Sequence, residues 1–300
     1  MQTNPNISYQ NCRLCARECG IDRAAGRIGR CGVSAEITLA RAALHAWEEP
    51  IISGAIGSGT VFFSGCSLGC VYCQNRVISR AEQGRAVSPE RLSDILLELQ
   101  GQGAHNINFV TPTHYAPSIV SAVADARAKG LSIPIVYNTS SYDRIDTLRA
   151  LESTVDIYLP DLKYYRAQTA KDLSLAEDYC EVAWDAICEM VRQRPEPIIE
   201  NGLMRSGVIV RILLLPGHLA EAKLNVKRLR ERFGDKIYIS LMAQYTPMPG
   251  MSAPLDRRVS RAEYAELVDY AVRLGVKNAF TQELGAAEDS FIPPFDYTGL

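Results

Sequence analysis

The chain has 300 residues, 47% of them hydrophobic and 22% charged, which is the composition of a globular protein with a large core. Its formal net charge of −2 excludes a general electrostatic attraction to nucleic acid or anionic lipid. The first residues show no signal-peptide pattern, and no apolar run approaches the roughly 18 residues that cross a bilayer. We therefore expect a cytoplasmic protein with no membrane or nucleic-acid partner, whose nine cysteines are metal ligands or thiols.

Residues 1–59 are rich in Gly, Arg and Cys and show little periodicity, so they are predicted to form an N-terminal extension packed on residues 60–300. Cys12, Cys15, Cys19 and Cys31 supply four thiols within 20 residues, which suits a closed zinc site or an auxiliary iron–sulfur cluster. The arginines between these cysteines form either a solvated face or a docking surface for an acidic electron donor such as flavodoxin.

From residue 60 onward, strand-like and helix-like segments alternate, which predicts an α/β fold with a parallel sheet and helical crossovers. Ser88-Pro89 marks one helix start, and Ser260 with Glu263 forms a capping box for another. Periodicity alone leaves an open sheet and a barrel as alternatives. The expected strands are Thr60–Ser64, Ile107–Val110, Ile133–Tyr137, Val155–Leu159, Val208–Leu215, Lys236–Leu241 and Asn278–Thr281.

A C-x3-C-x2-C run directly follows the first of these strands. Its thiols, Cys66, Cys70 and Cys73, can each hold one iron of a cubane cluster and leave the fourth iron open to a ligand. The alternatives are a three-cysteine zinc site completed by a distant histidine, and three buried structural cysteines. The position at a strand end favours the cluster.

Polar residues also gather at the ends of the later strands. They include Thr111–Tyr115, Asn138–Ser141, Asp161-Leu-Lys163, Arg211 and Gln244-Tyr245. Because ligands of α/β sheets bind at the carboxyl ends of the strands, these clusters are expected to face the cysteine loop and to form one site. Gly54-x-x-Gly57-x-Gly59 precedes its strand, so it predicts a tight turn and not a dinucleotide fingerprint.

The cysteine loop resembles the radical S-adenosylmethionine (SAM) superfamily, and Glu48-Glu49-Pro50, Thr111–His114 and Asp161-Leu-Lys163 carry the same resemblance. Within it, the chain looks most like the pyruvate formate-lyase activating enzymes and their PflX-like relatives. The resemblance covers essentially the whole chain and implies a partial, six-stranded (β/α) TIM-like barrel. It further implies a 4Fe–4S cluster on Cys66, Cys70 and Cys73, with SAM on the open iron.

The resemblance also assigns roles to residues at the strand ends. His114 and Tyr245 are expected to face the substrate, and Lys163 to hold the SAM carboxylate at the catalytic centre. This sequence departs from the family at Thr111–His114, where the family has Gly-Gly-Glu, and at Asn138, where the activating enzymes have Asp. The expected cofactor-binding residues are Tyr72, Thr111, Thr113, His114, Asn138, Thr139, Asp161, Lys163, Arg211 and Gln244.

The resemblance implies an enzyme that reductively cleaves SAM to a 5′-deoxyadenosyl radical, which then takes a hydrogen atom from a substrate. The electron donor would be of flavodoxin or ferredoxin type, and the substrate a glycine of a partner enzyme. The alternatives are a radical reaction on a small molecule or a peptide, and a non-catalytic iron–sulfur electron-transfer protein. The two missing carboxylates leave these alternatives open.

Overall fold

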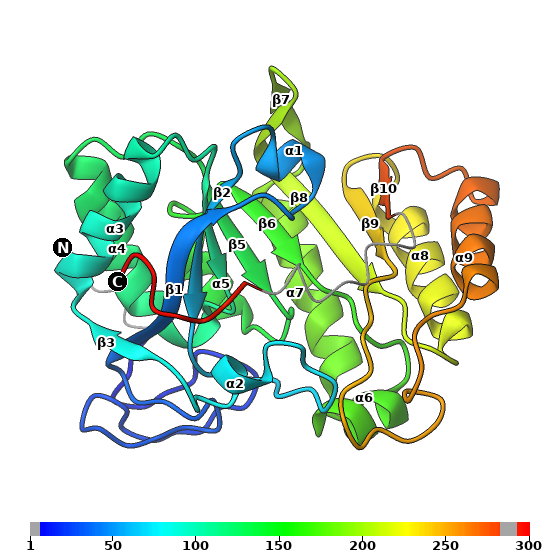
Figure 1. The fold of residues 1–300 in the computed structure, drawn as a ribbon, viewed down its shortest axis with the longest axis horizontal. Helices are drawn as coiled ribbons and strands as arrows, with labels where there is room; N and C mark the ends of the chain where they lie inside the picture. The colour runs from blue at the N-terminus through cyan, green and yellow to red at the C-terminus, as the bar shows by residue number, and fades with distance from the viewer. Residues whose placement is uncertain (1–6, 283–292) are drawn as a thin grey trace.

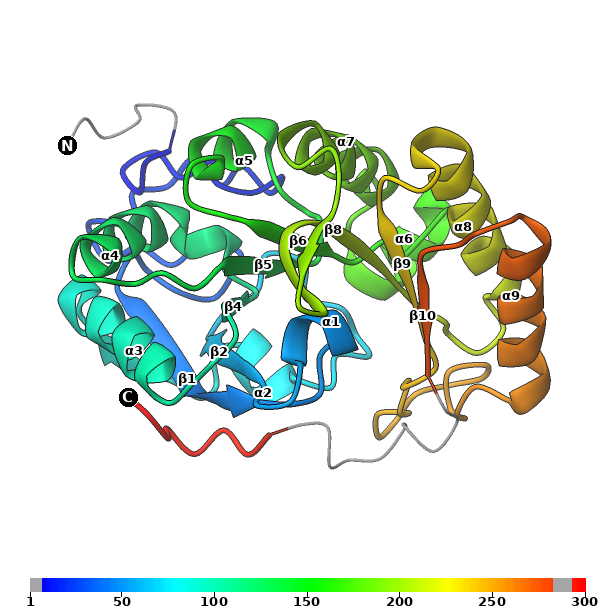
Figure 2. The same ribbon diagram turned by 90° about the horizontal axis from the view of Figure 1, so that it is seen from above.

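The computed structural model describes residues 7–282 and 293–300, and its centre is a ten-stranded sheet curved into a partial barrel (Figures 1 and 2). Seven strands run parallel, in the order β10-β9-β8-β6-β5-β4-β2. All seven strands expected from the sequence are present. They are β2 (Ser58–Phe63), β4 (Ile107–Val110), β5 (Ile135–Thr139), β6 (Ile157–Pro160), β8 (Leu203–Leu213), β9 (Tyr238–Met242) and β10 (Ala279–Thr281).

Helices cover the outer face of this sheet, as Figure 2 shows. Each parallel strand is followed by at least one helix before the next begins, which is the pattern of βαβ units. The longer helices that follow β2 to β9 are α3 (Pro89–Gly101), α4 (Ala116–Ala128), α5 (Ile145–Leu151), α6 (Ala167–Ser174), α7 (Tyr179–Gln193), α8 (Leu219–Phe233) and α9 (Arg261–Arg273). In the described part of the chain, no helix is long and apolar enough to cross a bilayer.

The predicted helix starts are confirmed. The Ser88 hydroxyl accepts a hydrogen bond from Arg91 N at the start of α3, where Pro89 occupies the first turn. Ser260 and Glu263 form the reciprocal capping box of α9. These caps satisfy backbone N–H groups that have no partner inside the helix.

The N-terminal region contains a strand that the sequence did not predict. β1 (Ile37–His45) pairs antiparallel with β2, and β3 (Arg85–Val87) pairs antiparallel with β1. Sequence periodicity missed β1 because its burial does not alternate strictly along the strand. The predicted extension of residues 1–59 therefore contributes one strand to the main sheet.

A short helix, α1 (Pro50–Ser53), connects β1 to β2 and lies at one end of the barrel. Its Ile52 is fully buried against interior side chains of β5, β6 and β8, namely Val136, Ile157, Leu159, Met204 and Ile209. Gly57 makes the turn into β2 with φ of +111°, and a Cβ there would lie 2.8 Å from the His45 carbonyl oxygen. Only glycine fits that turn without strain.

Candidate active site in the barrel

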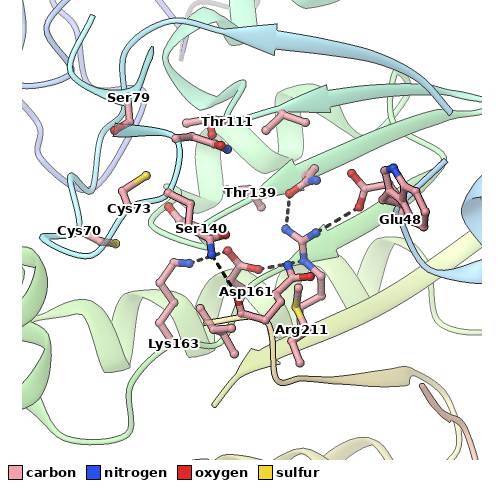
Figure 3. Close-up of a pocket in the computed structure, with 18 of the residues that line it drawn as sticks. Glu48, Cys70, Cys73, Ser79, Thr111, Thr139, Ser140, Asp161, Lys163 and Arg211 are labelled. Atoms are coloured by element: carbon pink, nitrogen blue, oxygen red, sulfur yellow. Dashed lines mark hydrogen bonds and ion pairs between the residues drawn. The ribbon is translucent and has the colours of Figure 1, made fainter. Parts of the chain in front are cut away.

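The cysteine loop follows β2 and borders a cavity of about 350 Å³ at the carboxyl ends of the parallel strands. Cys66, Cys70 and Cys73 all line this cavity, and Figure 3 shows the thiols of Cys70 and Cys73 near Lys163. Burial and, to a smaller extent, the nearby thiols Cys70 and Cys73 raise the pKa of Cys66 to about 12. The three thiols of this loop therefore face the same cavity.

The loop is fixed by contacts with the N-terminal region. Cys66 N donates to the carbonyl oxygen of Cys31 at 3.1 Å. The Arg17 guanidinium donates to Ser67 O at 3.0 Å and to Leu68 O at 3.2 Å. The same guanidinium bonds the carbonyls of Ser174 and Leu175 at the end of α6, so it joins the cysteine loop to the barrel.

A chain of ion pairs crosses the cavity beside the cysteine loop (Figure 3). The Asp161 carboxylate accepts from Lys163 Nζ at 2.7 Å and from Arg211 Nε at 3.0 Å. Arg211 also reaches Glu48 at 3.3 Å and the Oδ1 atom of Asn138 at 2.5 Å. Burial alone would raise the pKa of Asp161, but the two cations hold it below its usual value.

Comparison with known proteins shows the family to which this chain belongs. The model of the Radical SAM superfamily matches residues 60–229, which is more than half of the chain. The chain belongs to the radical SAM superfamily. The superfamily implies a 4Fe–4S cluster and SAM as cofactors.

One curated relative and two solved structures illustrate the likeness. An uncharacterized protein of Methanocaldococcus jannaschii, MJ0674, is 26% identical over 248 residues, 80% of this chain and 67% of that protein. A radical SAM methyltransferase from Sphaerobacter thermophilus aligns with a TM-score of 0.53 and 17% identity over 75% of this chain and 66% of its own. HydG, a maturase of the [FeFe]-hydrogenase, gives a TM-score of 0.51 and 18% identity over 75% of this chain. This chain spans about half of HydG, 51%, and at such identities the two structures show the shared fold alone.

The residues present fit the radical SAM cofactors. Three thiols of one loop line the cavity, and the Lys163 ammonium beside them can pair with a carboxylate. Tyr72 lies within the same wall, its hydroxyl 2.9 Å from that of Tyr164 and its ring 6.1 Å from that of Tyr245. The cavity thus combines sulfur ligands, a cation and aromatic surface.

The structure brings most of the predicted radical SAM site residues to this cavity. The Gln244 side chain is held by Gln282, whose Nε2 donates to its Oε1 at 3.0 Å. The Tyr245 hydroxyl donates to Leu255 O at 2.6 Å, so the aromatic ring is what Tyr245 presents to the cavity. The predicted residues that line the cavity, besides the three cysteines, are Tyr72, Thr111, Asn138, Thr139, Asp161, Lys163, Arg211, Gln244 and Tyr245.

Two residues predicted for the site, His114 and Thr113, lie outside the cavity lining. His114 is buried with its Nε2 atom 2.9 Å from Ser64 O, and burial lowers its pKa to about 3. The Thr113 hydroxyl donates to the buried Asp143 carboxylate at 2.7 Å. Thr139 lines the cavity, but its hydroxyl also donates to Asp143, at 2.6 Å. Sequence alone could not reveal that the Asp143 carboxylate accepts hydrogen bonds from both hydroxyl groups.

Sequence reasoning did not include Glu48 and Glu49 in the site, although both line the cavity. Asn108 Nδ2 donates to Glu48 Oε1 at 2.9 Å, and burial raises the pKa of Glu48 against the opposing effect of Arg211. The signal available in the sequence was two successive acids between apolar residues, directly before a proline. They supply carboxylates to a site in which this chain has no acid at Thr111–His114 or at Asn138.

The second cysteine group also comes together. Burial and, to a smaller extent, the neighbouring Cys31, Cys12 and Cys19 raise the pKa of Cys15 to about 12. Arg23 lies buried beside this group, with its Nη1 atom 3.7 Å from Cys12 Sγ. Within residues 7–282 and 293–300, no three His, Cys, Asp or Glu side chains already surround a single ion position. Arg23 therefore does not belong to a docking surface, whereas Arg13, Arg27 and Arg30 are exposed.

Proposed function

We propose that this protein is a radical SAM enzyme that abstracts a hydrogen atom from its substrate. Cys66, Cys70 and Cys73 would hold the 4Fe–4S cluster, and the observation that carries the proposal is that all three line the same cavity as the Asp161–Lys163–Arg211 network. When bound and supplied with one electron, the cluster and SAM provide a 5′-deoxyadenosyl radical.

The chain's own residues would bind and orient SAM in this cavity. Asp161 raises the pKa of Lys163 above its usual value although burial opposes it, so the ammonium stays charged and can pair with the SAM carboxylate. Arg211 donates a hydrogen bond to the Oδ1 atom of Asn138. The Asn138 Nδ2 hydrogens therefore remain as donors for a ligand. The rings of Tyr72 and Tyr245 provide apolar surface that keeps water from a reactive species.

Electron paramagnetic resonance of the anaerobically reconstituted protein tests this proposal. The reduced protein should show a 4Fe–4S signal whose shape changes when SAM is added, because SAM would become a ligand of the cluster. Cys73→Ala should lose the signal, and Cys180→Ala, which removes a cysteine of α7 outside the cavity lining, should keep it. A cluster signal that SAM leaves unchanged would contradict the assignment.

The narrower assignment is activation of a glycyl-radical enzyme, with a flavodoxin or ferredoxin as electron donor. The resemblance of the cysteine loop and of Asp161-Leu-Lys163 to the activating enzymes supports it. The exposed Arg13, Arg27 and Arg30 would meet the acidic donor. A glycyl radical signal in a candidate partner, dependent on SAM and on this protein, would establish it, and its absence would favour a small molecule or peptide.

The second cysteine group is proposed as a zinc or iron–sulfur site that fixes the N-terminal region against the cluster loop. Its support is the mutual proximity of Cys12, Cys15, Cys19 and Cys31, and the hydrogen bond from Cys66 N to Cys31 O. Metal analysis of the protein with Cys15→Ala as the comparison would identify the metal. Equal metal content in the two proteins would contradict this second site.

A further inference from the structure

The end of the barrel opposite the cysteine loop is closed by α1. Figure 1 shows α1 at the other end of the parallel strands from α2 (Arg76–Ser79), the helix that directly follows the cysteine loop. The Glu49 carbonyl accepts from Ile52 N at 2.8 Å and from Ser53 N at 3.0 Å, and Ile52 packs inside the barrel. The residues that precede α1, Glu48 and Glu49, are thereby carried to the floor of the cavity.

Two hydrogen-bond acceptors at this floor have no partner among the described residues. Glu49 is 8% exposed, lines the cavity, and its Oε2 atom is buried without a hydrogen bond. Asn108 is fully buried, and its Oδ1 atom is also without a hydrogen bond while its Nδ2 donates to Glu48 at 2.9 Å. A buried acceptor that lacks a donor destabilises the fold, and more so when it is charged.

Among the residues that the structure describes, one carboxylate at the floor has no ion pair. Asp161 forms ion pairs with Lys163 at 2.7 Å and with Arg211 at 3.0 Å, and Arg211 forms a further ion pair with Glu48 at 3.3 Å. Within residues 7–282 and 293–300, Glu49 forms no such ion pair. Burial raises its pKa and the repulsion of Glu48 adds to the rise, whereas the attraction of Arg211 and a hydrogen bond with the Ser240 side chain oppose it. A ligand that brings a positive charge with N–H donors would offset this burial.

We propose that Glu49 binds a cationic nitrogen group of the substrate, a primary ammonium or a guanidinium, at the floor of the cavity. This inference rests on the proposed function, because it places SAM at the other end, by the cysteine loop. Figure 3 shows Arg211 and Asp161 between Glu48 and the thiols of Cys70 and Cys73, so the floor is separated from the cluster ligands. A glycine backbone offers no such cation, so the inference points to a small amine or a basic peptide side chain.

Isothermal titration calorimetry tests this inference on the reconstituted protein in the presence of SAM. The titrated probe is n-butylammonium chloride, and n-butanol is its uncharged control. Wild-type protein should bind the ammonium saturably and at least tenfold more tightly than the alcohol. Glu49→Gln should weaken ammonium binding at least tenfold, and Glu36→Gln, which neutralises an exposed acid outside the cavity lining, should bind it like the wild type. Tighter binding of Nα-acetyl-lysine amide than of n-butylammonium would assign the cation to a peptide side chain, and the reverse order to a small amine.

Three results would overturn the inference. The first is that the wild type does not bind the ammonium ion, a result that does not depend on the folding of any variant. The second is equal ammonium binding by the wild type and Glu49→Gln. The third is a tenfold loss of SAM affinity in Glu49→Gln with unchanged ammonium binding. That result would show that the Glu49 carboxylate contacts SAM and not the substrate. Formation of 5′-deoxyadenosine by the wild type, measured separately, reports on the proposed function and so distinguishes the two failures.

Discussion

Asp161 is the residue on which the charges of the cavity depend. Its two oxygen atoms face different cations, Lys163 at 2.7 Å and Arg211 at 3.0 Å. The side chains of these two cations are only 14% and 12% exposed, so water cannot replace the carboxylate effectively. The network therefore holds both cations in place before any ligand arrives.

Asp161→Asn should destabilise the protein by about 3–5 kcal/mol, because it leaves buried positive charges without their carboxylate. Urea unfolding at pH 7 measures this change. Glu177→Gln removes one partner of the exposed Lys171–Glu177 ion pair and should cost less than about 1 kcal/mol. Similar losses in the two variants would show that the Asp161 network is not a buried one.

His114 should remain neutral across the physiological pH range. Burial, and then the nearby Arg23, lower its pKa from 6.5 to about 3, although the hydrogen bond with Ser64 opposes the change. The unfolded chain takes up the proton near pH 6.5, so this group costs stability progressively as the pH falls from 6.5 towards 3.

Magnetic resonance of isotope-labelled histidine measures this titration. The ring signals assigned to His114 by comparison with His114→Gln should not shift between pH 8 and pH 5. A midpoint near pH 6.5 for those signals would contradict the buried position of the ring.

At the scale of elements, the cysteine loop depends on a residue of the N-terminal region. Arg17 donates to Ser67 O, Leu68 O, Ser174 O and Leu175 O, and so links the loop to the end of α6. Arg17→Ala removes hydrogen bonds from a charged donor and should accelerate loss of the reconstituted cluster to a chelator by about tenfold or more. The decay of the cluster absorbance measures this rate, and Arg13→Ala, at an exposed position, should match the wild type.

Glu221 in the first turn of α8 connects that helix to the start of α6. Its carboxylate accepts from Tyr165 N at 3.0 Å, Arg166 N at 2.9 Å and the Thr169 hydroxyl at 2.7 Å. Burial would raise the pKa of Glu221, but these donors together with His218 lower it to about 2. Because the folded pKa is depressed, this stabilisation is complete above the unfolded value near 4.5 and is lost as the pH falls towards 2.

Glu221→Gln should therefore reduce the free energy of unfolding by about 1–3 kcal/mol at pH 7, and by less at pH 3. Denaturant unfolding of both proteins at the two pH values measures the difference. Glu231→Gln, at an exposed position of the same helix, is the matched control and should change little at either pH. A loss at pH 3 as large as at pH 7 would contradict the role given to the carboxylate.

At the scale of the whole molecule, hydrophobic runs and helix caps were enough to predict the parallel strands and their crossovers, because those signals are local. Strand β1 was not predicted because its burial pattern is irregular. Glu48 and Arg211 are 163 residues apart in sequence, so their ion pair could not be read from local pattern. The place of His114 after a strand is visible in the sequence, but its burial follows only from its contacts with Ser64 and Arg23.

Formation of 5′-deoxyadenosine tests most directly whether the cavity beside Cys66, Cys70 and Cys73 cleaves SAM. Anaerobically reconstituted protein with SAM and dithionite should form this product. Cys70→Ala should form none, whereas Cys188→Ala, which removes a half-buried thiol of α7, should retain the activity. No product from wild-type protein with an intact 4Fe–4S spectrum, or equal product from Cys70→Ala, would contradict the account.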